Sequence, residues 1–180
     1  MYTQICSSGV SLKTFEKEDV NIDEWLYYES ESSIVALNND WIFHFVESTP
    51  PINYNFVLKE IVPWTNMDFA EAKINMGTGV YQKAFNLEKG NFKEWLLDLG
   101  DVRETARVRI NGRNVATLWS VPYTVFVGKY LLEGRNTIEI EVTSLPANRI
   151  AEMDRQGAAW RQFKEINFVD LNYQNTGYGH

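Results

Sequence analysis

The side chains best suited to acid–base chemistry form two groups of carboxylates. Asp98, Asp101 and Glu104 lie close together in one acidic stretch, and Asp154 and Glu165 lie at the two ends of a second, strongly charged stretch. Two carboxylates can hydrolyse a glycosidic bond when they lie ~5–5.5 Å apart or ~6.5–9.5 Å apart, depending on the stereochemical course. Either group is therefore a candidate catalytic pair.

Both groups also have a simpler interpretation. Aspartates favour turns because their side chains bond to nearby backbone, so the first group is also typical of a solvated turn. The second group is interleaved with Arg155, Arg161 and Lys164, which also predicts ordinary ion pairs.

Composition limits the other kinds of catalysis. The chain has a single cysteine, Cys6, which excludes an intramolecular disulfide and a cysteine-based zinc cluster. The two histidines are His44, inside the strand-like stretch WIFHFVE, and His180, the last residue. We therefore expect no histidine-centred catalysis and a structural role for His44.

A third set of residues has the types that bind sugars. Flat aromatic rings stack on sugar faces, and planar polar groups bond to the hydroxyls. The candidates are Trp119, Tyr123, Arg149, Asp154, Arg155, Trp160 and Arg161. The arginines also suit a uronic acid carboxylate or an acidic face of a neighbouring domain. The alternatives are a core position for Trp119 and burial of Trp160 against another domain.

Charge and hydropathy restrict the partners of the chain. The 180 residues are 44% hydrophobic and 14% aromatic, which is typical of a folded, strand-rich protein. Residues 1–50 carry nine acidic residues against two lysines, whereas the remainder is balanced. We expect neither a nucleic-acid nor an anionic-membrane surface. No stretch approaches the ~18–20 apolar residues of a membrane helix, and the first residues do not resemble a secretion signal.

The apolar pattern divides the chain in two. Residues 1–33 are polar and acidic, and we predict an acidic extension or the tail of a preceding domain. Residues 34–180 carry alternating apolar residues, which predict the main domain. Strands are expected over residues 41–47, 55–61, 77–87, 94–101, 106–110, 113–117, 136–144 and 166–173. Residues 62–76 are expected to form a loop, with Trp64 and Trp95 used for packing.

A tight hairpin is the clearest local prediction. Asn111-Gly112 favours a type I′ turn, because both central residues need positive φ. A two-residue turn would place Val108 opposite Val115 and Ala106 opposite Thr117. Pro122 cannot continue a ladder of hydrogen bonds, so the aromatic segment after the hairpin should leave the sheet.

The order of these motifs resembles the sugar-binding domain of family 2-type glycoside hydrolases, a galactose-binding-like jelly-roll β-sandwich. The residues that carry the resemblance are Asp98, Gly100, Val108, Asn111, Gly112, Tyr123, Leu131, Gly134, Asn136, Ile138, Ile140 and Val142. The later stretch NRIAEMDRQGAAWRQFKEINFVDLNYQ resembles the C-terminal end of rhamnosidase-related enzymes, akin to glycoside hydrolase family 106. The resemblance covers about residues 35–175.

This resemblance implies an all-β accessory domain of a glycoside hydrolase that acts on plant or host polysaccharide. Catalysis in such enzymes lies in a separate barrel, which needs ~250 residues, so no catalytic residue is assigned here. The implied partners are weakly bound carbohydrate, a catalytic domain, or both. No organic cofactor is implied, although sandwiches of this type sometimes hold a structural calcium ion. Export as part of a larger enzyme is also implied.

Two other functions stay open at the level of sequence. The first is a structural or protein-interaction β-sandwich that packs on a catalytic partner and binds no sugar. The second is an independent small hydrolase that uses Asp154 and Glu165.

Overall fold

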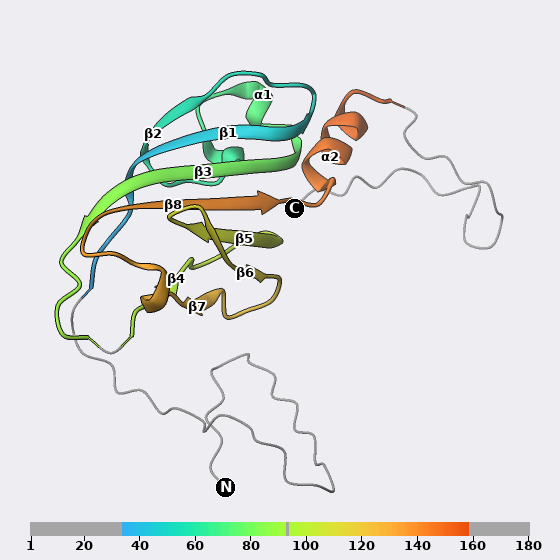
Figure 1. Ribbon diagram of the computed structural model, residues 1–180. Helices are drawn as coiled ribbons and strands as arrows, with labels where there is room; N and C mark the ends of the chain where they lie inside the picture. Colours follow the sequence, from blue (N-terminus) through green and yellow to red (C-terminus); the bar gives the residue numbers. More distant parts are fainter. Residues whose placement is uncertain (1–33, 93, 159–180) are drawn as a thin grey trace, which may run out of the picture.

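Two antiparallel sheets of unequal size make up the protein (Figure 1), as seen in a computed structural model that describes residues 34–92 and 94–158. The large sheet contains, in spatial order, β2 (Phe56–Glu60), β1 (Asn39–Thr49), β3 (Met76–Leu87), β8 (Gly134–Thr143), β5 (Thr105–Ile110) and β6 (Arg113–Leu118). The small sheet contains β4 (Leu96–Asp98) and β7 (Thr124–Phe126). The short helical elements are η1 (Trp64–Asn66), α1 (Ala70–Lys73), η2 (Gly128–Tyr130) and α2 (Ala147–Arg155). The predicted all-β sandwich is confirmed.

Alternation along the strands determines which side chains enter the core. Trp41, Phe43 and Phe45 are buried on one face of β1, and Ile138 and Ile140 are buried on β8. Each set follows the period of two that places alternate side chains on the same face. The strand predicted over residues 166–173 and the predicted extension over residues 1–33 lie outside the described residues.

An aromatic cluster fills one end of this core. The ring of Phe43 lies 4.6 Å from that of Tyr81 and 5.8 Å from that of Trp64, between centroids. Gly79 on β3 makes room for this cluster, because a Cβ atom there would lie only 2.4 Å from the Phe43 ring. The predicted packing role of Trp64 is confirmed, and its position depends on η1, which lies in a segment predicted to be a loop.

The Asn-Gly hairpin forms as predicted, but its register differs. Asn111 and Gly112 have φ values of 51° and 74°, as a type I′ turn requires. The predicted pairing is wrong: Val108 lies opposite Ala116, not Val115. A β-bulge between Val108 and Arg109 leaves Val115 as an extra residue on β6, which shifts every later pair by one position. Ala106 therefore lies opposite Leu118 instead of Thr117.

Two asparagine side chains, one of them buried, join this hairpin to the turn before β8. Asn136 is 1% exposed, and its Oδ1 accepts hydrogen bonds from the Leu132 N–H and the Asn111 Nδ2, both at 2.8 Å. Its Nδ2 donates to the carbonyl oxygens of Leu132 and Gly134. We call Asn111 and Asn136 the asparagine network. Both asparagines thus stabilise turns that are far apart in the sequence.

Candidate functional site

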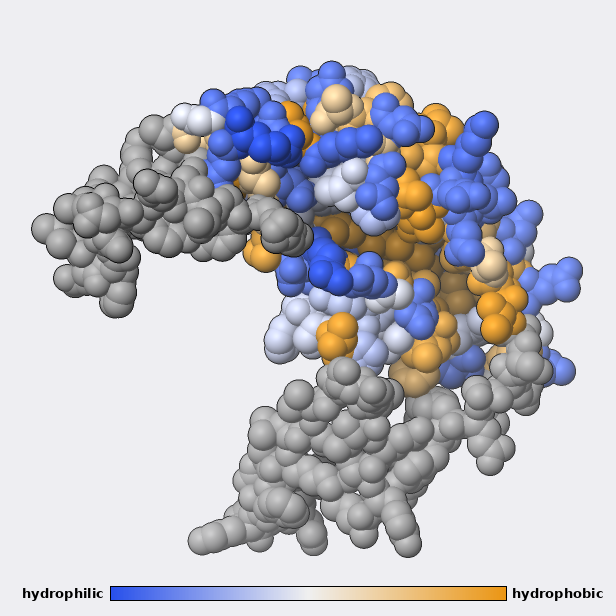
Figure 2. Space-filling model, turned by 180° about the vertical axis from the view of Figure 1, so that it is seen from behind, coloured by the Kyte–Doolittle hydropathy of each residue, from blue (hydrophilic) through white to orange (hydrophobic). Residues whose placement is uncertain are grey.

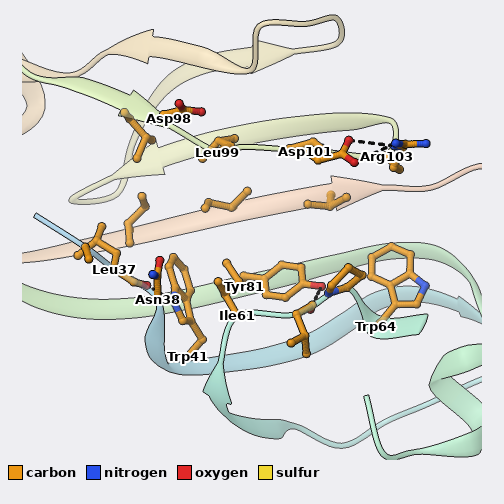
Figure 3. A pocket seen from close by; sticks show the side chains of 18 of the residues that line it. Leu37, Asn38, Trp41, Ile61, Trp64, Tyr81, Asp98, Leu99, Asp101 and Arg103 are labelled. Carbon is orange, nitrogen blue, oxygen red and sulfur yellow. Dashed lines mark hydrogen bonds and ion pairs between the residues drawn. The ribbon is translucent and has the colours of Figure 1, made fainter. Parts of the chain in front are cut away.

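A deep cleft opens between the inner face of the large sheet and the segment that contains β4. Its volume is about 1090 Å³. In Figure 3, Trp41, Trp64 and Tyr81 lie on one side of the cleft, and Asp98 and Arg103 lie on the other. Figure 2 shows a hollow lined by hydrophobic residues on this side of the molecule. The lining is predominantly apolar. It therefore suits contact with apolar side chains better than binding of a free, fully hydroxylated sugar.

The Tyr81 hydroxyl, a polar group of the cleft, is bonded within the protein. The Tyr81 hydroxyl donates a hydrogen bond to the Val62 carbonyl at 3.0 Å. Burial raises the pKa of Tyr81, because the surrounding apolar side chains disfavour the charged phenolate. Tyr81 is therefore a neutral structural donor, not a base.

Three residues that line the cleft each have a buried polar atom without a hydrogen-bond partner in the described chain. The Nε1 atoms of Trp64 and Trp95 and the Oγ of Ser144 are buried, and none has a hydrogen-bond partner within the described part of the chain. Buried polar groups in folded proteins are nearly always hydrogen-bonded, so each orphan requires an explanation.

The exposed Trp119 lies at one corner of the sandwich. Its side chain is 74% exposed, directly after the end of β6. Ala106 pairs with Leu118, so the start of β5 lies next to the end of β6. The turn before Ala106 carries Asp101 and Arg103. We call Trp119, Asp101 and Arg103 the Trp119 corner.

Asp101 and Arg103 form a bidentate salt bridge at this corner. The Arg103 Nε and Nη2 atoms each lie 2.9 Å from a different carboxylate oxygen of Asp101. The Arg103 guanidinium holds the pKa of Asp101 below its ordinary value by hydrogen bonding, and Asp101 in turn raises the pKa of Arg103. Sequence reasoning did not select Arg103, because only the tertiary structure brings its turn to the end of β6.

The structure does not gather the predicted sugar-binding residues into one site. Tyr123 is only 6% exposed, and its hydroxyl donates to the Glu104 carbonyl at 2.9 Å, so its ring belongs to the core. Arg149, Asp154 and Arg155 lie on α2, which packs near β3. Leu118 pairs with Ala106, and Ala106 pairs with Val142, so Trp119 and the end of β8 that leads into α2 lie at the same end of the large sheet, two strands apart. Trp160 and Arg161 lie outside the described residues.

Asp98 and Asp101, the first predicted carboxylate group's aspartates, bond to residues close to them in the sequence. Asp98 accepts a hydrogen bond from the Gly100 N–H at 2.8 Å, and Asp101 pairs with Arg103. A general acid needs a raised pKa, whereas the pKa of Asp101 is lowered. The turn-forming interpretation therefore fits Asp98 and Asp101. Glu165, one half of the second predicted pair, lies outside the described residues.

Metal binding by side chains also lacks support in this part of the molecule. Within residues 34–92 and 94–158, no three His, Cys, Asp or Glu side chains lie close enough together to hold an ion. The residues described here therefore do not fit a calcium site built from several carboxylates. Over the same residues, no helix is long and apolar enough to cross a membrane.

Comparison with known families decides the class of this fold. Residues 59–178 match the family described as "Glycosyl hydrolase 2 galactose-binding domain-like". The chain belongs to this family. The match includes the hairpin, the asparagine network and α2, so it confirms the resemblance inferred from the ordered motifs.

Individual relatives of this galactose-binding-like domain are much longer proteins. It is 32% identical over 119 residues to a protein of Formosa agariphila named "Putative beta-glucuronidase", covering 64% of this chain and 10% of that protein. It is also similar to the structure of a rhamnosidase from Novosphingobium sp. PP1Y, with a TM-score of 0.65 and 28% identity over 74% of this chain and 13% of the rhamnosidase. A β-glucuronidase of Faecalibacterium prausnitzii shares the fold, with a TM-score of 0.51, 21% identity, and coverage of 66% and 22% of the two chains. The chain thus spans about a tenth of the length of the first two relatives.

Proposed function

We propose that this galactose-binding-like domain is a non-catalytic accessory domain of a larger glycoside hydrolase that binds carbohydrate weakly at the Trp119 corner. The observation that carries this proposal is the exposed Trp119 ring directly after β6, together with the exposed Arg103–Asp101 pair on the segment that leads into the adjacent strand β5. An indole face offers a stacking surface for a sugar ring, and the ion pair offers donors and acceptors for hydroxyls.

The non-catalytic part of the proposal is supported by the carboxylates and by length. Asp98 and Asp101 make local turn and ion-pair contacts, and the pKa of Asp101 is shifted away from that of a general acid. Relatives with enzyme names are several times longer than this chain. Their additional length can contain a catalytic barrel of ~250 residues.

The relatives also suggest the class of substrate. One is named as a rhamnosidase and one as a β-glucuronidase. Rhamnose and uronic acids occur together in plant cell-wall polysaccharide, so we propose a polysaccharide of this kind as the substrate of the whole enzyme, and export as its destination. Arg103, and Arg149 and Arg155 on α2, suit the carboxylate of a uronic acid.

The alternative is a domain that docks on its catalytic partner without binding sugar. Leu96 and Phe126 lie directly opposite each other in the small sheet, and their side chains are both exposed. Exposed apolar pairs of this kind are typical of surfaces that are buried by another domain.

A calorimetric titration of the domain distinguishes the two functions. The panel contains rhamnose, galactose, galacturonate, glucuronate and pectin oligosaccharides, with and without calcium. We expect saturable binding that Trp119→Ala abolishes and Tyr54→Ala, the loss of an exposed ring elsewhere, leaves unchanged. Arg155→Ala and Trp160→Ala test the other predicted contacts. If the folded domain binds no glycan, the docking function is favoured instead.

A further inference from the structure

The turn of the Asn-Gly hairpin has a sequence that can react with itself. The backbone nitrogen that follows an asparagine can attack the side-chain amide, and glycine favours this attack because it has no Cβ to crowd the nitrogen. In the 180-residue chain, Asn111 is the only asparagine that is followed by glycine. Gly112 is exposed at the tip of the hairpin, so water and base can reach this turn.

The side-chain amide of Asn111 is hydrogen-bonded at both of its polar atoms. Its Oδ1 accepts from the Thr137 N–H at 2.9 Å, and its Nδ2 donates to the Tyr130 carbonyl at 2.9 Å and to the Asn136 Oδ1 at 2.8 Å. These partners lie 19 to 26 positions further along the chain. The folded protein is therefore needed to hold the amide in this arrangement.

Attack by the Gly112 nitrogen is incompatible with these three hydrogen bonds. This nitrogen loses its proton to base and forms a bond to the Asn111 Cγ, which becomes tetrahedral. The Cγ–Nδ2 bond then breaks, and Nδ2 takes up a proton and leaves as ammonia. The resulting five-membered succinimide is opened by water to aspartate or isoaspartate. Because both amide atoms of Asn111 move during ring closure, their hydrogen bonds must break first.

We propose that Asn111-Gly112 is a deamidation site that the asparagine network protects in the folded protein and that opening of the hairpin exposes. This proposal does not depend on whether the domain binds sugar. The modification also prevents the network from forming again. An ionised aspartate has no donor, so at position 111 a carboxylate oxygen would face two acceptors, the Tyr130 carbonyl and the Asn136 Oδ1. Isoaspartate adds a methylene to the backbone, which disrupts a two-residue turn.

Deamidation rates in native buffer and in urea test this protection. The full 180-residue chain is incubated at mildly alkaline pH, and cleavage after glutamate then releases residues 105–133, whose other asparagine is Asn114. Mass spectrometry of this peptide identifies the modified residue. We expect Asn111 to react at least about a hundredfold more slowly in native buffer than in unfolding urea, because the protein opens rarely. Asn114, which is followed by valine, should react little in either condition.

Two variants distinguish the network from overall stability. Asn136→Ala removes one acceptor of the Asn111 amide, whereas Ile140→Ala removes a buried side chain of β8 and leaves the three bonds of the amide in place. Urea is added to the more stable variant until the two unfolding free energies are equal. We then expect Asn111 to deamidate about tenfold faster in Asn136→Ala than in Ile140→Ala, because its hairpin opens locally more often.

The consequence of the modification is tested with Asn111→Asp. We expect this change to shift the folding equilibrium at least about tenfold toward the unfolded state at pH 7, because it leaves the acceptors of the network without a donor. The matched control is Asn114→Asp, which should have almost no effect because its oxygen can still accept from the Arg109 Nε.

Four results would overturn the proposal. Equal rates in native buffer and in urea would show that the amide of Asn111 is not protected, and no reaction in urea would show that the pair is not reactive. Equal rates in Asn136→Ala and Ile140→Ala at equal stability would assign the protection to the whole fold instead of the network. An Asn111→Asp variant as stable as the unmodified protein would show that the network tolerates the product.

Discussion

Two regions of the sandwich differ in how their buried polar groups are satisfied. In the asparagine network, both amide atoms of Asn136 are hydrogen-bonded and the side chain is almost fully buried. In the cleft, Trp64, Trp95 and Ser144 each bury a polar atom that lacks a partner among the described residues. Desolvating an unpaired polar group costs about 1–3 kcal/mol. The first region therefore satisfies its polar groups within the described chain, whereas the second leaves three of them unpaired there.

This difference indicates where new contacts can form. A satisfied network favours one local arrangement and gains nothing from a partner. A buried orphan donor, by contrast, gains a hydrogen bond only if the surrounding side chains move enough for an acceptor or a water molecule to reach it. The contrast can be tested by substitutions on each side.

The largest effect is expected for Asn136→Ala. The change removes the four hydrogen bonds of a side chain that is 1% exposed, although the Asn111 Nδ2 keeps its bond to the Tyr130 carbonyl, so we expect a loss of about 3 kcal/mol in unfolding free energy. Urea unfolding followed by tryptophan fluorescence measures it. Asn114→Ala removes an exposed asparagine that accepts a bond from Arg109, and it should cost only a few tenths of a kcal/mol, about the size of most surface substitutions. Equal losses in the two variants would contradict the special role of the asparagine network.

A smaller effect is expected for Tyr81→Phe, which breaks a satisfied bond inside the cleft. Loss of the hydrogen bond to the Val62 carbonyl should cost about 1 kcal/mol at neutral pH. Because burial raises the pKa of Tyr81, its contribution is fully present below the unfolded pKa of about 10 and is lost as the pH rises above it. The unfolding free energy of the unmodified protein should thus fall more steeply above pH ~10 than that of Tyr81→Phe. Tyr54→Phe, at a half-exposed position, should retain the steep decline.

Ser144→Ala sharpens the comparison because the change hardly alters volume. The Ser144 hydroxyl is buried without a partner among the described residues, so we expect its removal to raise the unfolding free energy by about 0.5 kcal/mol or to leave it unchanged. Ser120→Ala, at an exposed position, should have no measurable effect in the same urea titration. A loss of about 1 kcal/mol in Ser144→Ala would show that the hydroxyl is hydrogen-bonded.

The smallest effect is expected for Asp101→Asn at the mouth of the cleft. The ion pair with Arg103 is mostly exposed, with side-chain exposures of 70% and 77%, so water screens it. We expect no measurable change in urea unfolding at pH 7. The lowered pKa of Asp101 means that any contribution is present at neutral pH and fades as the pH falls through its folded value. A clear loss of stability at pH 7 would show that another element covers this corner.

Local patterns in the sequence determined much of the fold. The alternation in WIFHFVE and NTIEIEVTS predicted the buried faces of β1 and β8, because side-chain direction in a strand repeats every two residues. Asn111-Gly112 predicted the turn, because few residues tolerate positive φ. The order of such motifs indicated the family, which the match over residues 59–178 confirms.

Only the tertiary structure decided the register and the sites. The bulge at Val115 depends on how β6 fits against β5, which the turn residues do not encode. The burial of Tyr123 and the position of Trp119, two strands away from the end of β8 that leads into α2, depend on how the strands are arranged in space. The partnership of Asn111 with Asn136 joins residues 25 positions apart in the sequence. Contacts of this kind depend on long-range packing, whereas a local pattern fixes only the direction of each side chain from its own strand.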